Sequence, residues 1–169
     1  MSGRRMAAVV AACVLGACGG GDDGRTVDSA PASALHYDTA RVRILTPTDT
    51  IPLSVELARS DEQKQLGLME RRTLGDRAGM LFLYGTEQSD SSGFWMYRTR
   101  IPLDIAFIDS TGTIRTIRTM QPCTSDLAGA CPSYMAGARY RAALEVNAGF
   151  FERNRVQVGH RVMLSDTAR

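Results

Sequence analysis

The sequence predicts one β-rich α+β domain, a mostly antiparallel sandwich or barrel with two short helices, over residues 36–167. Three observations predict it. Short apolar segments of strand length recur along this part of the chain, turn residues separate them, and only two stretches favour brief helices. A chain near this length buries roughly two-thirds of the surface that it exposes when unfolded, which is enough for a core without a structural metal.

The first strands are predicted to form a β-hairpin. Apolar residues alternate with other residues from Ile51 to Leu57, which is typical of a half-buried strand. Val42 and Ile44 precede this strand across a turn at residues 46–49, so they supply its partner.

A short helix follows the hairpin. Ser60 and Gln63 have the spacing of a capping box, in which each side chain bonds the backbone N–H of the other residue. Asp61 and Glu62 then lie in the first turn, where negative charge is favoured. Gly67 interrupts the pattern, so the helix is short.

The middle of the chain predicts buried strands. Gly79–Tyr84 is a continuous apolar run of strand length, which indicates burial on both faces. Phe94–Met96 and Leu103–Ile108 are the next apolar segments. The loop Asp109–Gly112 contains glycine and joins the last of them to a strand at Thr113–Met120 in a second hairpin.

The strand Thr113–Met120 fits the two-residue period badly, because Ile114 and Ile117 fall on opposite faces. A β-bulge between them would reconcile the two. The remainder predicts a strand, a short helix and a final strand, at Ala142–Val146, Ala148–Asn154 and Arg161–Leu164.

Two arginines near the N-terminus precede an apolar stretch, which leads to Leu15-Gly16-Ala17-Cys18. This pattern resembles a bacterial lipoprotein signal peptide, with the last four residues as its cleavage motif. The resemblance implies removal of residues 1–17 and a lipid on Cys18, which would anchor the protein outside the cytoplasm, facing the periplasm, to the cell membrane or an outer membrane. Residues 6–17 are fewer than the roughly 20 that a helix needs to span a bilayer. An ordinary secretory signal with a coincidental cysteine is the alternative.

A tether and a neutral domain follow the signal. Residues 18–35 are rich in Gly, Ser, Ala and Asp without an apolar period, so we expect a flexible linker. Loss of the two signal-peptide arginines reduces Lys and Arg from 20 to 18, against 18 Asp and Glu. A neutral domain lacks the basic surface that nucleic acids bind, so no nucleic-acid partner is expected.

Cys123 and Cys131 are predicted to form a disulfide. Cys13 leaves with the signal peptide and Cys18 carries the lipid, so these two remain, and an oxidising compartment favours their pairing. A redox-active or metal-binding pair and two free thiols are the alternatives. The spacing is not Cys-x-x-Cys, and no histidine is near in sequence.

A series of short motifs runs through residues 40–165: Gln65-Leu66-Gly67-Leu68-Met69-Glu70-Arg71, Gly79-Met80-Leu81-Phe82, Phe94-Trp95-Met96, residues 99–109, Pro122-Cys123, Cys131-Pro132-Ser133-Tyr134 and Ala143-Leu144-Glu145-Val146. In residues and in order, these motifs resemble the family named domain of unknown function 192. Arg98 departs from the family, which often has Asn before Thr99. The resemblance implies a compact, β-rich, jelly-roll-like domain that is often exported, with no established activity and no catalytic residues to carry over.

Trp95 is the only tryptophan, and the sequence leaves two interpretations of it. We expect a core residue, because tryptophan buries a large area. The alternative is a stacking surface at the mouth of a pocket.

Asp104 and Glu145 are the candidate acid–base residues, although no catalytic residue is assigned. Asp104 lies among apolar residues, so it is expected to be partly buried and paired with Arg98, Arg100 or Arg139. The alternative is a pair with Glu145 in an extracytoplasmic hydrolase.

The methionines have two interpretations. Clustered thioethers bind Cu(I), which would make the protein a copper carrier, whereas methionine commonly fills gaps in cores. The five candidates are Met69, Met80, Met96, Met120 and Met135.

The sequence lacks a Gly-x-Ser-x-Gly elbow, a His-Glu-x-x-His helix and a phosphate-binding Gly-Lys-Ser/Thr loop. We therefore expect a non-catalytic domain that binds a small ligand or an envelope protein, with no cofactor and no metal. The expected binding region is residues 94–100 together with residues 123–134. Its candidate residues are Trp95, Met96, Arg98, Thr99, Asp104, Tyr134 and Glu145.

Overall fold

The structure is a computed structural model that describes residues 35–165. The predicted signal peptide, Cys18 and the predicted tether as far as residue 34 lie outside the described residues. Between residues 35 and 165, no helix has the length and apolar character needed to cross a membrane.

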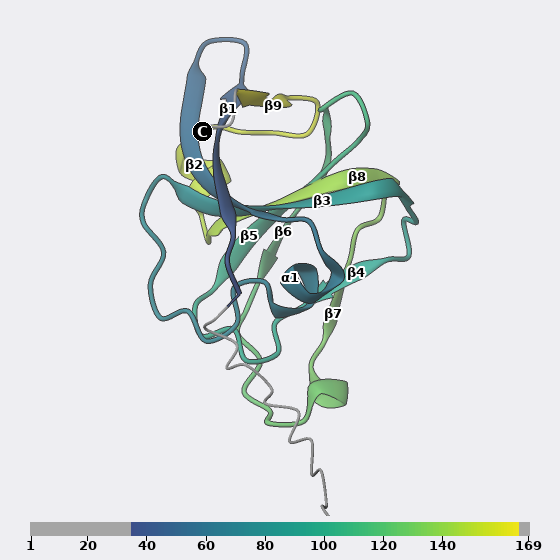
Figure 1. Cartoon of the computed structure of the whole chain (residues 1–169). Coiled ribbons are helices and arrows are strands. Elements are labelled where there is room, and N and C mark those ends of the chain that lie inside the picture. Colours follow the sequence, from purple (N-terminus) through teal and green to yellow (C-terminus); the bar gives the residue numbers. More distant parts are fainter. Residues whose placement is uncertain (1–34, 166–169) are drawn as a thin grey trace, which may run out of the picture. The chain divides into compact units, whose positions relative to one another are not determined.

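Seven strands form one curled sheet in the order β6-β5-β8-β3-β2-β1-β9 (Figure 1). The sheet forms a half-barrel, which confirms the expected β-rich fold class. Its edge strands, β6 and β9, approach each other at a bridge between Thr113 and Arg161. The strands are β1 (Asp38–Leu45), β2 (Thr50–Ala58), β3 (Ala78–Gln88), β5 (Leu103–Ile108), β6 (Ile114–Met120), β8 (Tyr140–Asn147) and β9 (Arg161–Ser165).

Two short strands form a separate ribbon beside the main sheet. These are β4 (Gly93–Trp95) and β7 (Ser133–Met135), and they pair antiparallel with Phe94 opposite Tyr134. The helices are α1 (Asp61–Leu66), α2 (Phe150–Arg153) and a 3-10 turn, η2 (Ala128–Ala130).

The pairing of β2 with β3 is parallel, whereas the other pairs of the sheet are antiparallel. A parallel pair needs a long connection, because the chain must return to the end where the first strand began. Here α1 and residues 67–77 make that connection. The capping box of Ser60 and Gln63 is confirmed, and Gly67 ends the helix with φ 49°. Figure 1 shows α1 beside β4.

The sheet separates two apolar cores, one on each face. Successive residues of a strand point to opposite faces, and all six residues of β5 are buried because both faces are covered. The first core gathers Val42, Ile44, Leu53, Ala106, Leu144, Phe151 and their neighbours. The second core gathers Met80, Phe82, Met96, Ile105, Phe107, Tyr140 and their neighbours.

The predicted hairpins and the predicted bulge are confirmed. Phe107 pairs with Thr116 and Ile108 with Ile114, so the β6 strand has one extra residue, Arg115. The bulge lets Ile114 and the partly buried Ile117 both pack against the first core.

The disulfide between Cys123 and Cys131 is confirmed. We expect the Cys123→Ser/Cys131→Ser double variant to lose about 2.5 kcal/mol of unfolding free energy, because the bond restricts a short loop in the unfolded chain. Urea unfolding of the oxidised protein and the variant measures this difference. Reduced wild type is the control and should match the variant, whereas equal midpoints for the oxidised and reduced wild type would contradict the expected contribution.

Candidate functional site

Glu145 is a buried carboxyl that has no partner in the part of the chain that the structure describes. It lies on β8 opposite Met80 of β3 and Ile105 of β5, and it is 4 % exposed. This register directs its side chain toward the second core. Within residues 35–165 no hydrogen bond or ion pair reaches the carboxyl, and burial raises its pKa to about 8. The group is therefore mostly protonated at neutral pH.

A narrow cavity of about 30 Å³ leads to Glu145. Among the described residues no fully enclosed side-chain oxygen lacks a hydrogen-bond partner, so the oxygens of Glu145 border this cavity. The walls come from four parts of the chain: residues 64–69 of the β2–β3 connection, Phe82 of β3, Phe94 and Trp95 of β4, and Thr99.

Trp95 lies at the surface beside this cavity, so the expectation of a core residue is wrong. It is 40 % exposed, and its ring centroid is 5.7 Å from that of Tyr97. The reason is local: β4 lies outside the main sheet, and alternation along it turns Phe94 inward and Trp95 outward. The inward ring of Phe94 packs edge-on against the rings of Phe82 and Phe107, with distances between ring centroids of 4.9 Å and 5.7 Å.

A clamp centred on Glu70 joins two walls of the cavity. The backbone N–H of Glu70 donates to the carbonyl of Arg98 at 2.7 Å. The Glu70 carboxylate accepts from Arg98 Nε at 2.7 Å and from Arg100 Nε at 2.9 Å. These hydrogen bonds from Arg100 and Arg98 lower the pKa of Glu70. The clamp therefore fixes residues 67–70 against residues 96–100.

Both backbones in this clamp adopt the left-handed conformation. Glu70 has φ 61° and Arg98 has φ 54°, values that cost energy for most residues and are tolerated best by Gly, Asn and Asp. Such strain is concentrated at functional sites in many proteins. It also gives a physical reason for the Asn that the family resemblance implies at position 98, where Arg98 instead contributes an ion pair.

Asp104 faces away from Glu145. It pairs with Val146, the residue after Glu145, so the two carboxyl groups point to opposite faces of the sheet. Asp104 accepts hydrogen bonds from Thr119 Oγ1 at 2.8 Å and from the backbone N–H of Phe151 at 3.4 Å.

The expected pairing of Asp104 with arginine is wrong. Arg98 and Arg100 bind Glu70, and Arg139 binds Glu87 at 2.9 Å. Asp104 is only 3 % exposed, on a strand that is covered on both faces. Its hydrogen-bond donors are therefore groups packed directly against it, Thr119 and the backbone of Phe151.

Of the remaining candidates, Met69 lines the cavity, whereas Met96 and Tyr134 do not. Met96 is buried in the second core. The Tyr134 hydroxyl accepts from the backbone N–H of Gln121 at 2.9 Å. The backbone N–H of Cys123 donates to the carbonyl of Met96 at 3.3 Å, so the two predicted binding segments do lie side by side. Met80 and Met120 also pack within the second core, where they fill space between apolar side chains.

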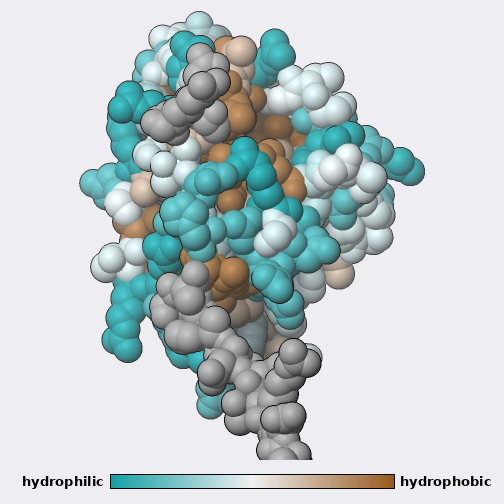
Figure 2. Space-filling model, in the orientation of Figure 1, coloured by the Kyte–Doolittle hydropathy of each residue, from teal (hydrophilic) through white to brown (hydrophobic). Residues whose placement is uncertain are grey.

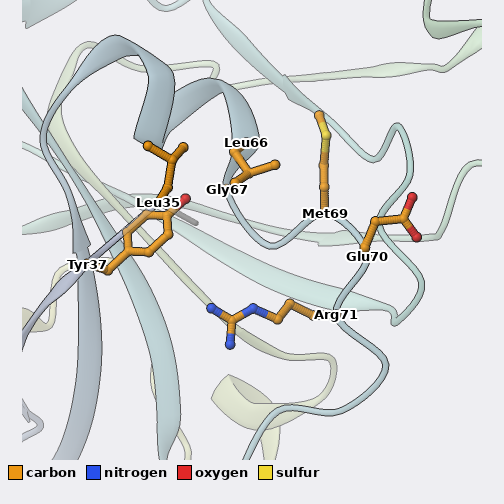
Figure 3. A pocket seen from close by; sticks show the side chains of 7 residues that line it. All are labelled: Leu35, Tyr37, Leu66, Gly67, Met69, Glu70 and Arg71. Carbon is orange, nitrogen blue, oxygen red and sulfur yellow. The ribbon is translucent and has the colours of Figure 1, made fainter. Parts of the chain in front are cut away.

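The larger cavity in Figure 3 is a weaker candidate. It measures about 510 Å³, and in Figure 3 Leu35 and Tyr37 line one side of it while Met69, Glu70 and Arg71 line the other. Its polar groups already have partners: the Tyr37 hydroxyl donates to the carbonyl of Gln63, and Arg71 forms an ion pair with Glu56.

Most of the face shown in Figure 2 is hydrophilic, with hydrophobic residues visible in gaps between polar ones.

One family model matches this chain, and two solved structures are similar to it. The model of domain of unknown function 192, described as "Uncharacterized ACR", matches residues 43–164. A solved structure described as a "putative transcription regulator" from Sinorhizobium meliloti 1021 is 36% identical with a TM-score of 0.69, over 77% of this chain and 96% of that one. A protein of unknown function from Novosphingobium aromaticivorans is 27% identical with a TM-score of 0.64, over 78% and 95%. None of the curated proteins matches this chain. The chain belongs to the domain of unknown function 192 family.

Proposed function

We propose that this protein is a lipid-anchored, extracytoplasmic domain that binds a small ligand in the Glu145 cavity. One observation carries the proposal: the Glu145 carboxyl is 4 % exposed, borders a cavity and has no hydrogen-bond or ion-pair partner among residues 35–165. Leaving a buried polar group unpaired costs free energy, so such a group is retained where something else pairs with it. Ligand sites typically place polar groups beside apolar and aromatic walls, and here the Glu145 carboxyl lies beside Phe82, Phe94 and Trp95.

The geometry favours binding over paired-carboxylate hydrolysis. A hydrolase of that kind needs two carboxyl groups in one cleft, flanking the scissile bond at a separation of roughly 5–10 Å. Asp104 and Glu145 point to opposite faces of the sheet, and Asp104 is already bonded to Thr119. Glu145 is thus a single carboxyl at the cavity, which is sufficient to bind a ligand but not for paired-carboxylate hydrolysis.

The proposed location rests on the N-terminal motif and on the disulfide. In cells fed radiolabelled palmitate, we expect the wild-type protein to be labelled and to sediment with membranes. Cys18→Ser should lose both the label and the membrane association, because the lipid attaches to that sulfur. Cys13→Ser is the matched control and should stay labelled; label retained by Cys18→Ser would remove the anchor from the proposal.

Ligand retention tests the binding function. The folded domain, incubated with a small-molecule extract of the cell envelope and then desalted, should retain a compound that native mass spectrometry detects. Glu145→Gln should lose it, because an amide replaces the acid. Glu152→Gln changes an exposed acid on α2 and should retain it. Retention of no compound by wild type, or equal retention by Glu145→Gln, would contradict the proposal.

A further inference from the structure

We propose that the group which enters the cavity beside Glu145 is an ammonium group, so that the ligand is a small organic amine held by the Glu145 carboxylate and the surrounding aromatic side chains. This inference rests on the proposed function, and it adds the chemical class of the ligand.

The size of the cavity restricts what can reach Glu145. A volume of about 30 Å³ holds roughly one water-sized group. An ammonium or a hydroxyl has that size, whereas a carboxylate, a phosphate, an acetamido group or a guanidinium is larger. The ligand therefore inserts a single small polar head and leaves its body outside, near the exposed ring of Trp95.

The walls favour a cation over a hydroxyl. Phe82, Phe94 and Trp95 all line the cavity, and the faces of aromatic rings attract cations. A carboxylate at the base completes such a site, because an ion pair formed away from water needs a close partner of opposite charge. The protein already uses this chemistry next to the cavity: the Lys64 ammonium lies 5.1 Å from the centre of the Tyr84 ring.

The protein's own cations near the cavity are engaged elsewhere. Lys64 lines the cavity, but its ammonium is 2.9 Å from Asp61. On the same face of the sheet, Arg118 of β6 donates from Nε to the carbonyl of Met135 at 3.5 Å. Neither forms a salt bridge with Glu145, so the position beside its carboxyl is left to a ligand.

The remaining titratable groups around Glu145 do not supply a competing charge. Glu56 of β2 lies on the same face and forms an ion pair with Arg71 at the far side of Met80. Burial raises the pKa of Tyr84 and of Tyr140, so both phenols are neutral at physiological pH. Glu145 is thus the one acid at the base of the cavity among residues 35–165.

Amine binding requires a balanced proton transfer. Below about pH 8 the free site holds a protonated carboxyl, and the ligand arrives as an ammonium. Forming the carboxylate–ammonium pair releases the proton of Glu145 to the buffer, while the ammonium keeps its own protons. A hydroxyl ligand binds the protonated acid directly and releases none.

Two isosteric probes separate these cases: n-butylammonium chloride and 1-butanol. Trp95 is the only tryptophan, so its fluorescence reports binding at the cavity mouth. We expect n-butylammonium to bind at least tenfold more tightly than 1-butanol at pH 8. Its affinity should rise about tenfold per pH unit between pH 6 and 7.5 and level off above about pH 8. A pH-stat titration without buffer at pH 6.5 should give the release of nearly one proton per bound amine.

Two variants serve as controls. Glu145→Gln should abolish the pH dependence and weaken n-butylammonium binding at least tenfold at pH 8, whereas Glu152→Gln should leave both unchanged. Equal binding of the two probes, or amine binding without proton release, would overturn the ammonium assignment. If n-butylammonium does not bind but the wild type retains an envelope compound that Glu145→Gln loses, the ammonium assignment fails and the proposed binding function stands. If neither is observed, both fail.

Discussion

Glu145→Gln is expected to gain unfolding free energy relative to wild type as the pH rises. The difference between variant and wild type should be about 5 kcal/mol more favourable to the variant above pH 8 than at pH 4. The pKa of Glu145 is about 8 in the folded protein, against an ordinary value of 4.5. Below pH 4.5 both the folded and the unfolded chain are protonated. Between pH 4.5 and about 8 the unfolded chain loses this proton while the folded chain keeps it, so the wild-type unfolding free energy falls by about 1.4 kcal/mol per pH unit. Glutamine does not titrate and lacks this loss.

Urea unfolding at pH 4, 6, 7.5 and 9 measures the effect. The difference between Glu145→Gln and wild type should grow in favour of the variant from pH 4 to about pH 8 and then stay constant. Glu152→Gln is the exposed control, and its unfolding free energy should follow that of the wild type. A constant difference between Glu145→Gln and wild type at all four pH values would mean that Glu145 is ionised in the folded protein at neutral pH.

Gly79→Ala is expected to lower the unfolding free energy by about 3 kcal/mol, because overpacking against the backbone forces the strands apart. Gly79 is buried on β3 opposite Val146, and an added Cβ would lie 2.5 Å from the backbone oxygen of Glu145 and 3.1 Å from Val146 Cγ1. The first of these atoms belongs to a central strand and cannot move without disturbing the register that places Glu145 at the cavity.

Gly85→Ala is the matched control for this change. Gly85 lies on the same strand, and an added Cβ there meets nothing within 4 Å. We expect its unfolding free energy to stay within about 0.5 kcal/mol of wild type, as is usual for exposed positions. If Gly79→Ala and Gly85→Ala lose the same unfolding free energy in thermal or urea unfolding, the account is contradicted. The loss would then come from replacing any glycine of this strand, and not from the contact of Gly79 with β8.

Local patterns were sufficient to predict most strands of this fold. Alternation in Ile51–Leu57 and the capping box at Ser60 depend on neighbouring residues alone, and both are confirmed. The parallel pairing of β2 with β3 was not predicted. It depends on how the β2–β3 connection packs, which involves contacts between residues far apart in the chain.

The candidate site was predicted only in part, because it too depends on contacts between residues far apart in the chain. Glu145, Trp95 and Thr99 were candidates, and the structure brings all three to one cavity. Phe82 and residues 64–68 were missed as site residues, and Met69 was named only as a copper candidate. The β2–β3 connection brings residues 64–69 to the cavity, and the glycine-containing motif at 65–71 was the available signal. The partner of Asp104 could not be identified, since the pattern of β5 gives the alternation but not which residue of β6 lies opposite.

The carbon-13 NMR titration of the Glu145 side-chain carboxyl tests the central claim most directly, with the Glu145→Gln spectrum assigning the signal. An acid that is buried without a partner should titrate near pH 8 in the folded protein. A midpoint between pH 4 and 5 would contradict the account, because it would show a carboxylate that is already solvated or paired and leaves nothing for a ligand to complete.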